Sequence, residues 1–239
     1  MMEIIPVIDL MAGQVVHARY GKRQHYQPIQ SLLCIGSKPN DIIHALLELY
    51  PFKTLYIADI DAIQESDNQF DSLVALTESF PEVTFWLDCG IRQMNHRALH
   101  YQKNIRPVIG SENMDNLINY KAVSYACNSR HILSLDFKDD QFLGANELYS
   151  SSKYWPDDTI CMSLKNVGSE QGFDLDTLNS IMQLNLARKS PSRLYAAGGV
   201  RNIEDCNNLQ RLGINGALVA TALHQKKITY SELKNFLET

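Results

Sequence analysis

Short apolar runs rich in β-branched and aromatic residues alternate with longer amphipathic segments along almost the whole chain. This alternation predicts βα units and a parallel sheet. Strands are expected at 3–9, 54–59, 83–88, 105–110, 131–136, 159–164, 193–197 and 216–220. Helices are expected at 40–50, 68–79, 93–103, 114–127, 145–153, 174–188, 202–211 and 229–238. Several strands lack polar alternation, which is typical of strands that are buried on both faces.

An internal repeat favours a closed barrel over an open, doubly wound sheet. The turn Gly90-Ile91-Arg92 recurs as Gly199-Val200-Arg201, and one unit later the run 108–111 recurs as 218–221. Two similar half-barrels of four units each would produce these correspondences. The sequence therefore predicts a (β/α)8 TIM barrel with an internal twofold half-barrel repeat. Because no Pro/Gly/Ser-rich linker divides the chain, residues 1–239 are expected to form a single domain.

Composition narrows the class of protein. Apolar residues make up 45% and charged residues 21%, as in ordinary globular proteins, and the net charge of −5 argues against nucleic-acid or membrane partners. No apolar stretch approaches the roughly 20 residues of a membrane span, and the N-terminus is more typical of a strand than of a signal peptide. The five cysteines lack metal-ligand spacing. We expect reduced core thiols, no metal, a cytoplasmic location, and a monomer or weak homo-oligomer.

Glycine turns at strand ends indicate phosphate binding, because glycine lets backbone N–H groups approach an oxyanion closely. Two opposed pockets are expected, the first after the third and fourth strands and the second after the seventh and eighth, where barrel enzymes often bind phosphate. The first would comprise Gly90, Arg92, Gly110 and Ser111, and the second Gly198, Gly199, Ala220 and Thr221. The alternative is that these glycines only allow tight turns at helix starts.

Two aspartates end strongly apolar strands on opposite sides of the predicted barrel. Asp9 ends the first strand and Asp136 the fifth. An unpaired charge is costly to bury, so both carboxylates are expected at the mouth of the barrel. Different environments could hold one protonated and the other ionised, which favours a general acid–base pair. The alternative is a structural role in which each aspartate binds loop N–H groups.

Taken together, several motifs resemble the histidine-biosynthesis barrels over nearly the whole chain, and most closely the ProFAR isomerase branch. These are the run 5–10 followed by 13–16, the Gly90 turn, Ser134-Leu135-Asp136, Gly198-Gly199-Val200 and 216–219. The resemblance implies a bis-phosphorylated ribosyl substrate, no organic cofactor, and an Amadori rearrangement of an aminoaldose to an aminoketose. It assigns ring opening to Asp136 as the acid, and proton transfer from C2 to Asp9 as the base.

Three loops depart from the family pattern. Only Gly168-Ser169 and Gly172 persist after the sixth strand, Ala220-Thr221 replaces a usual glycine, and Asp88-Cys89 stands in a normally Gly-rich turn. A carboxylate beside a phosphate pocket is repulsive unless it is paired or protonated. We therefore predict an altered first pocket and a partly kept second one.

Other residues keep alternatives open. The basic loop 21–28, which contains Arg23, either closes over an anionic ligand or is a solvated loop. Lys165 ends the sixth strand, where Schiff-base aldolases place their nucleophile, or is a surface lysine. Asp59 ends the second strand and could contact ligand hydroxyls. The alternatives to a ProFAR-type isomerase are a diverged paralogue linked to tetrahydromethanopterin metabolism that acts on another phosphorylated substrate, a lyase, and a non-catalytic ligand-binding barrel.

Overall fold

The structure is a computed structural model that describes residues 2–65, 70–93, 104–128, 130–139, 141–169 and 172–238. Of the helix expected at 93–103, only Gln93 is among these residues. The helix expected at 68–79 is described from residue 70 onward.

Eight parallel strands form a closed barrel, as predicted. They are β1 (Glu3–Met11), β4 (Thr54–Asp59), β5 (Thr84–Asp88), β6 (Ile105–Gly110), β7 (Ile132–Lys138), β9 (Asp158–Ser163), β10 (Arg193–Ala197) and β11 (Gly216–Val219). Each strand pairs with the next in parallel, and β1 pairs with β11 from Glu3 opposite Gly216 to Pro6 opposite Val219. The sheet has no open edge between its first and last strands. The (β/α)8 TIM barrel is therefore confirmed.

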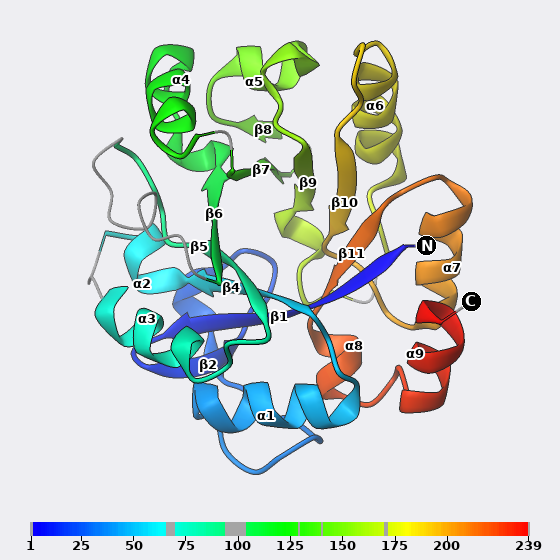
Figure 1. The fold of residues 1–239 in the computed structure, drawn as a ribbon. Coiled ribbons are helices and arrows are strands. Elements are labelled where there is room, and N and C mark those ends of the chain that lie inside the picture. The colour runs from blue at the N-terminus through cyan, green and yellow to red at the C-terminus, as the bar shows by residue number, and fades with distance from the viewer. Residues whose placement is uncertain are drawn as a thin grey trace.

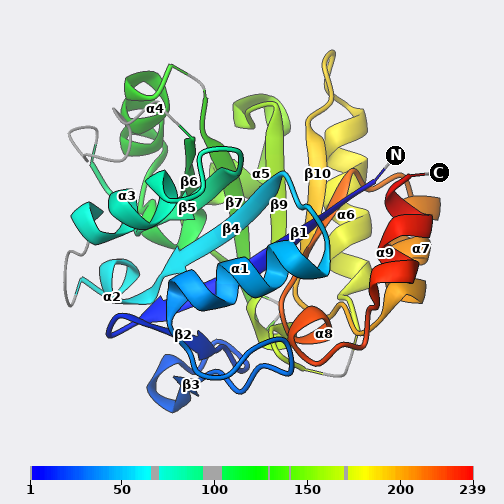
Figure 2. The ribbon, with the colours of Figure 1, turned by 60° about the horizontal axis from the view of Figure 1, so that its bottom comes forward.

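Helices surround the barrel, as Figures 1 and 2 show. They are α1 (Pro39–Leu49), α2 (Ile60–Ile63), α3 (Phe70–Glu78), α4 (Leu117–Ala126), α5 (Asn146–Ser150), α6 (Leu175–Leu186), α7 (Ile203–Arg211), α8 (Thr221–His224) and α9 (Tyr230–Leu237). Their apolar faces and the outward-facing strand residues bury one large core. In the part of the chain that the structure describes, no helix is both long and apolar enough to cross a membrane.

Several short elements were not predicted. Two strands, β2 (Gln14–His17) and β3 (Gln27–Pro28), extend β1 into an antiparallel meander, and β8 (Gln141–Leu143) forms a hairpin with β7. Among the described residues, the 3-10 turns are η1 (Arg23–His25), η3 (Ser111–Asn113), η4 (Ser152–Tyr154) and η5 (Leu164–Asn166). The chain turns from β1 into β2 through Ala12 and Gly13, both with positive φ. The meander positions η1 at the barrel mouth.

A second core fills the barrel interior. Its members from the barrel strands occupy alternate positions, because side chains of a strand point to opposite faces. The rings of Trp86 and Tyr195 pack edge to face, 4.7 Å between centroids, and the Tyr195 hydroxyl donates to Asp158 at the start of β9. This end of the barrel is thus filled, and polar side chains collect at the other end.

Candidate active site

A cavity of about 100 Å³ lies at the C-terminal ends of the barrel strands. Four ionisable side chains from four strands line it, namely Asp9 from β1, Tyr56 from β4, Asp88 from β5 and Asp136 from β7. A second, more polar cavity of about 430 Å³ shares Gly168, Ser169, Val200 and Thr221 with the first. The two cavities therefore adjoin along the loops after β9, β10 and β11.

Asp136 is held in place by hydrogen bonds. Its carboxylate accepts from Ser134 Oγ at 2.6 Å, from the Glu112 amide at 3.1 Å and from Ser111 Oγ at 3.4 Å. Its own amide donates to Ser111 Oγ at 2.9 Å. Burial, followed by repulsion from Glu112, raises the pKa of Asp136 to about 8. At neutral pH this carboxyl group can therefore carry a proton to donate.

Asp9 has fewer partners. No hydrogen bond to its carboxylate comes from any of the described residues, and the nearby Arg23 acts on it only through charge. Burial raises the pKa of Asp9 to about 7, against the lowering influence of Arg23. Near neutral pH this group can therefore accept a proton.

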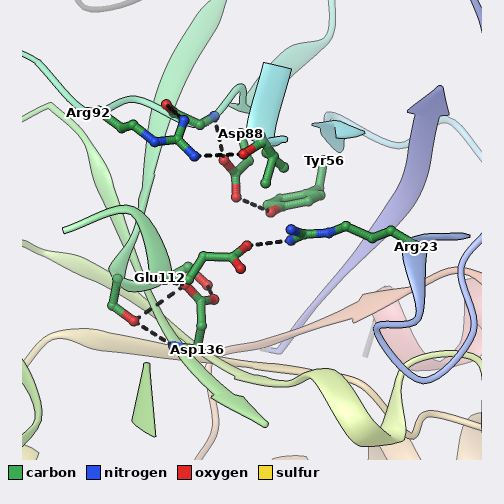
Figure 3. A network of polar contacts seen from close by, with 10 residues as sticks. Arg23, Tyr56, Asp88, Arg92, Glu112 and Asp136 are labelled. Atoms are coloured by element: carbon green, nitrogen blue, oxygen red, sulfur yellow. Dashed lines mark hydrogen bonds and ion pairs between the residues drawn. The ribbon is translucent and has the colours of Figure 1, made fainter. Parts of the chain in front are cut away.

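Asp88 forms a pair with Tyr56, a residue that the sequence analysis did not single out (Figure 3). The Tyr56 hydroxyl donates to Asp88 Oδ2 at 3.1 Å, and the Gly90 amide donates to Oδ1 at 3.2 Å. Burial is the main cause that raises the pKa of Asp88 to about 6. A Cβ at Gly110 would lie 3.2 Å from Asp136 Oδ2 and 3.6 Å from Asp88 Oδ2, so the two carboxylates flank this glycine.

Arg23 reaches from η1 across the mouth to Glu112, another residue that the sequence analysis did not single out (Figure 3). Its Nη2 lies 2.5 Å from Glu112 Oε1, and both side chains line the cavity. The predicted basic loop thus contributes a cation, although that cation is already paired with an acid.

None of the four residues predicted for the first phosphate pocket lines either cavity. Arg92 donates to the carbonyls of Gly90 at 2.9 Å and Ile63 at 2.7 Å, and pairs with Glu65 at 2.7 Å. Ser111 bonds to Asp136, and Gly110 makes room for the carboxylates. These residues therefore hold neighbouring loops and carboxylates instead of lining the cavity.

The residues predicted for the second pocket do line the cavity, together with Gly168 and Ser169. Gly198 and Gly199 have φ of +91° and +97°, and a Cβ at Gly199 would collide with the carbonyl of Gly172. Among the described residues, no acceptor is found for the amides of Gly199 and Val200. Backbone donors are therefore available beside this part of the cavity.

The remaining predicted residues lie elsewhere. Lys165 lies in η5, half-buried, and does not line the cavity. Asp59 is buried on the outer side of the barrel, where its carboxylate caps α2 by accepting from the Ala62 amide at 3.1 Å. In the described ranges no group of His, Cys, Asp or Glu could hold a metal ion.

The fold and this site define a (β/α)8 barrel with acidic groups at its C-terminal mouth. Comparison with known proteins then identifies the family: the chain belongs to the family described as histidine biosynthesis protein, whose sequence model matches residues 3–229. This confirms the resemblance found in the sequence.

Individual relatives match along their whole lengths. An uncharacterized protein of Methanocaldococcus jannaschii is 27% identical over 243 residues, covering 98% of each chain. The 1-(5-phosphoribosyl)-5-((5-phosphoribosylamino)methylideneamino) imidazole-4-carboxamide isomerase of Flavobacterium johnsoniae is 21% identical, covering 99% of each chain. The isomerase of the same name from Thermococcus onnurineus is 23% identical, covering 99% of this chain and all of its own.

Proposed function

We propose that this protein is an intramolecular isomerase that converts a phosphorylated aminoaldose of the ribosyl type into the corresponding aminoketose. The observation that carries the proposal is that Asp9 and Asp136 line one cavity, with pKa values raised to about 7 and about 8. An acid and a base that both titrate near neutral pH suit this reaction. Membership of the family and the names of two relatives support the reaction class.

Asp136 acts first in the proposed reaction. Its carboxyl proton passes to the ring oxygen of the sugar while the bond from C1 to that oxygen breaks and the nitrogen lone pair forms a C1–N double bond. Ser134, Ser111 and the Glu112 amide fix the direction in which Asp136 points. Burial supports this role, because a neutral carboxyl group is favoured where a charged one is poorly solvated.

Asp9 acts in the second step as a base. It removes the proton from C2, and the electrons of that C–H bond neutralise the iminium nitrogen to give an enolamine. Protonation at C1 and loss of the C2 hydroxyl proton then give the aminoketose, so the reaction gains and loses no atoms. The lack of a hydrogen-bond donor to Asp9 among the described residues supports its availability as a base.

The phosphate of the substrate would bind along Gly168-Ser169, Gly198-Gly199 and Ala220-Thr221. The amides of Gly199 and Val200 support this position, since backbone N–H groups after barrel strands commonly hold phosphate.

Turnover of phosphorylated aminoaldoses by the purified protein tests the proposal. ProFAR and simpler 5-phosphorylated aminoaldoses would be followed by proton NMR in deuterated water, where loss of the C2 proton reports the second step. Asp9→Asn and Asp136→Asn should each reduce kcat about 100-fold or more. Glu204→Gln, which removes an exposed carboxylate from α7, should leave kcat unchanged. Unaltered turnover in both aspartate variants, with cooperative unfolding preserved, would refute the roles assigned to them.

A further inference from the structure

The two ends of the site differ in charge. Around the first cavity stand four acids, Asp9, Asp88, Glu112 and Asp136, with Arg23 already paired to Glu112. Around the adjoining cavity, by contrast, stand Arg19, Lys227 and Arg201, of which Arg201 is paired with Asp205. A ligand that spans both cavities therefore meets acids at one end, and basic side chains with backbone amides at the other.

At the acidic end, several donors of the described residues are already in use. The Gly90 amide is bonded to Asp88, and the Glu112 amide and Ser111 Oγ are bonded to Asp136. The Arg92 guanidinium is used by two carbonyls and by Glu65. A phosphate carries a charge of about −1.5 to −2 at neutral pH, so at this end it would meet carboxylates and find these donors occupied.

The volume of the acidic end also argues against a second phosphorylated group there. It measures about 100 Å³, below the roughly 300 Å³ at which pockets for larger organic ligands begin. The ion pair of Arg23 with Glu112 crosses its mouth (Figure 3). A small group fits this end better than a second phosphorylated moiety does.

The proposed reaction does not use Asp88 or the Glu112 carboxylate, and of these two only Glu112 is in an ion pair with Arg23. Asp88 is 7% exposed, lines the cavity, and accepts hydrogen bonds on both oxygens from groups that favour its ionised form. Asp9, which has no donor among the described residues, lines the same cavity. These oxygens are the hydrogen-bond acceptors that the N–H groups of a cationic nitrogen require.

We infer that the substrate is a sugar monophosphate with a simple amino group on C1, whose nitrogen becomes cationic when its lone pair forms the C1–N double bond, with Asp88 as the counter-ion of that iminium and the phosphate on the loops after β9, β10 and β11. This inference rests on the proposed function and refines its substrate: the nitrogen of the aminoaldose carries no second phosphorylated group. Asp88 is then the residue that sets specificity for the charged nitrogen.

The three aspartates of the cavity give the inference a measurable consequence, which is the release of protons when a cation binds. The raised pKa values of Asp9, Asp88 and Asp136 reflect the poor solvation of their anions. A bound ammonium compound, which mimics the cationic nitrogen of the iminium, stabilises those anions and lowers their pKa values, so its binding releases protons near neutral pH.

Four simple compounds test the inference by calorimetry at pH 7: glucosamine 6-phosphate, glucosamine, glucose 6-phosphate and fructose 1,6-bisphosphate. Glucosamine 6-phosphate should bind at least tenfold more tightly than any of the others, with release of protons. Asp88→Asn should reduce its advantage over glucose 6-phosphate to about twofold or less. Glu204→Gln should keep the advantage, since that side chain is 60% exposed and outside both cavities.

The outcomes separate the inference from the proposed function. If fructose 1,6-bisphosphate binds as tightly as glucosamine 6-phosphate or more tightly, the inference is overturned, while phosphate binding by the site stands. An amine preference that survives Asp88→Asn also overturns the assignment of the counter-ion. If glucosamine without phosphate binds as well as its 6-phosphate, the phosphate site of the proposed function fails, and the inference fails with it.

Discussion

The guanidinium of Arg23 and the carboxylate of Glu112 lie 2.5 Å apart and join two loops that are 89 residues apart in sequence. One loop follows the β1–β2 hairpin and the other follows β6. Because the Glu112 amide also donates to Asp136, the same short turn fixes the buried acid and anchors the loop above it. Closure of the mouth and placement of Asp136 are therefore linked.

We expect this ion pair to contribute to stability. The two side chains are only about one-fifth exposed, at 21% and 20%. Removal of this ion pair should therefore cost more stability than removal of a surface ion pair. Arg23→Met should lower the free energy of unfolding by about 1–2 kcal/mol, because Glu112 is left unpaired beside Asp136 and Asp88. Urea denaturation measures this change.

A double-mutant cycle with Glu112→Gln provides the control. Once Glu112 has lost its charge, Arg23→Met should cost clearly less than it does alone. Additive effects of the two substitutions would show that the pair contributes nothing.

The pH dependence of turnover follows from the two aspartates. The base must be ionised and the acid protonated, so kcat/KM should rise as pH passes about 7 and fall as pH passes about 8. The two groups share one cavity, so the measured values belong to the pair. Asp88→Asn should move the alkaline limb to lower pH, because the charge of Asp88 helps to raise the pKa of Asp136. A profile that is flat from about pH 6 to about pH 9 would contradict the assignment.

Stability should depend on pH with the opposite sign to that of a carboxylate whose pKa is lowered by ion pairing in the folded state. An unfolded chain releases the Asp136 proton near pH 3.8, whereas the folded protein keeps it up to about pH 8. Between these values the folded state binds more protons, so stability falls as pH rises. Below about pH 6.5 the buried His131 and His224, with pKa values lowered to about 4, act in the other direction.

The window above the ordinary histidine pKa isolates the aspartates. Between about pH 6.5 and about pH 8, the free energy of unfolding should fall by about 1 kcal/mol per pH unit or more. Asp136→Asn should make this slope shallower, and urea titrations at the two ends of the window measure it. A slope that Asp136→Asn leaves unchanged would rule out Asp136 as a source of the effect.

The barrel strands could be predicted because each is a short run of buried residues without polar alternation. Asp9 and Asp136 could also be placed at the mouth from their positions at strand ends. The position of Asp59 could have been predicted as well: Tyr56 and Ala58 face the interior, so the next residue must face outward.

What could not be predicted is how hydrogen-bond donors are shared between loops. Gly90, Gly110 and Ser111 occupy the expected turns, but their use depends on where the Asp88 and Asp136 side chains lie. Tyr56 and Glu112 carry no sequence motif. Tyr56 becomes recognisable only when the strand register places its hydroxyl beside Asp88, and Glu112 only when the loop containing Arg23 closes over it. These contacts join loops far apart in the chain.

The glycine at position 199 offers a test of the phosphate loops with a matched control. Gly199 and Gly213 both have positive φ, +97° and +84°, so alanine strains the backbone at either position by about 1–2 kcal/mol. A Cβ at Gly213 meets nothing within 4 Å, whereas a Cβ at Gly199 collides with the carbonyl of Gly172. Gly199→Ala should therefore cost about 2 kcal/mol or more beyond Gly213→Ala in thermal or urea unfolding.

The same pair of variants separates stability from binding. Relief of the collision must move the loop after β10, and with it the Gly199 and Val200 amides that line the cavity. Gly199→Ala should thus weaken the binding of glucose 6-phosphate at least tenfold at a temperature where the variant is folded. Gly213 lies after α7 and lines neither cavity, so Gly213→Ala should bind the same probe as the unsubstituted protein does. Equal affinities in the two variants would mean that the amides after β10 do not hold the phosphate.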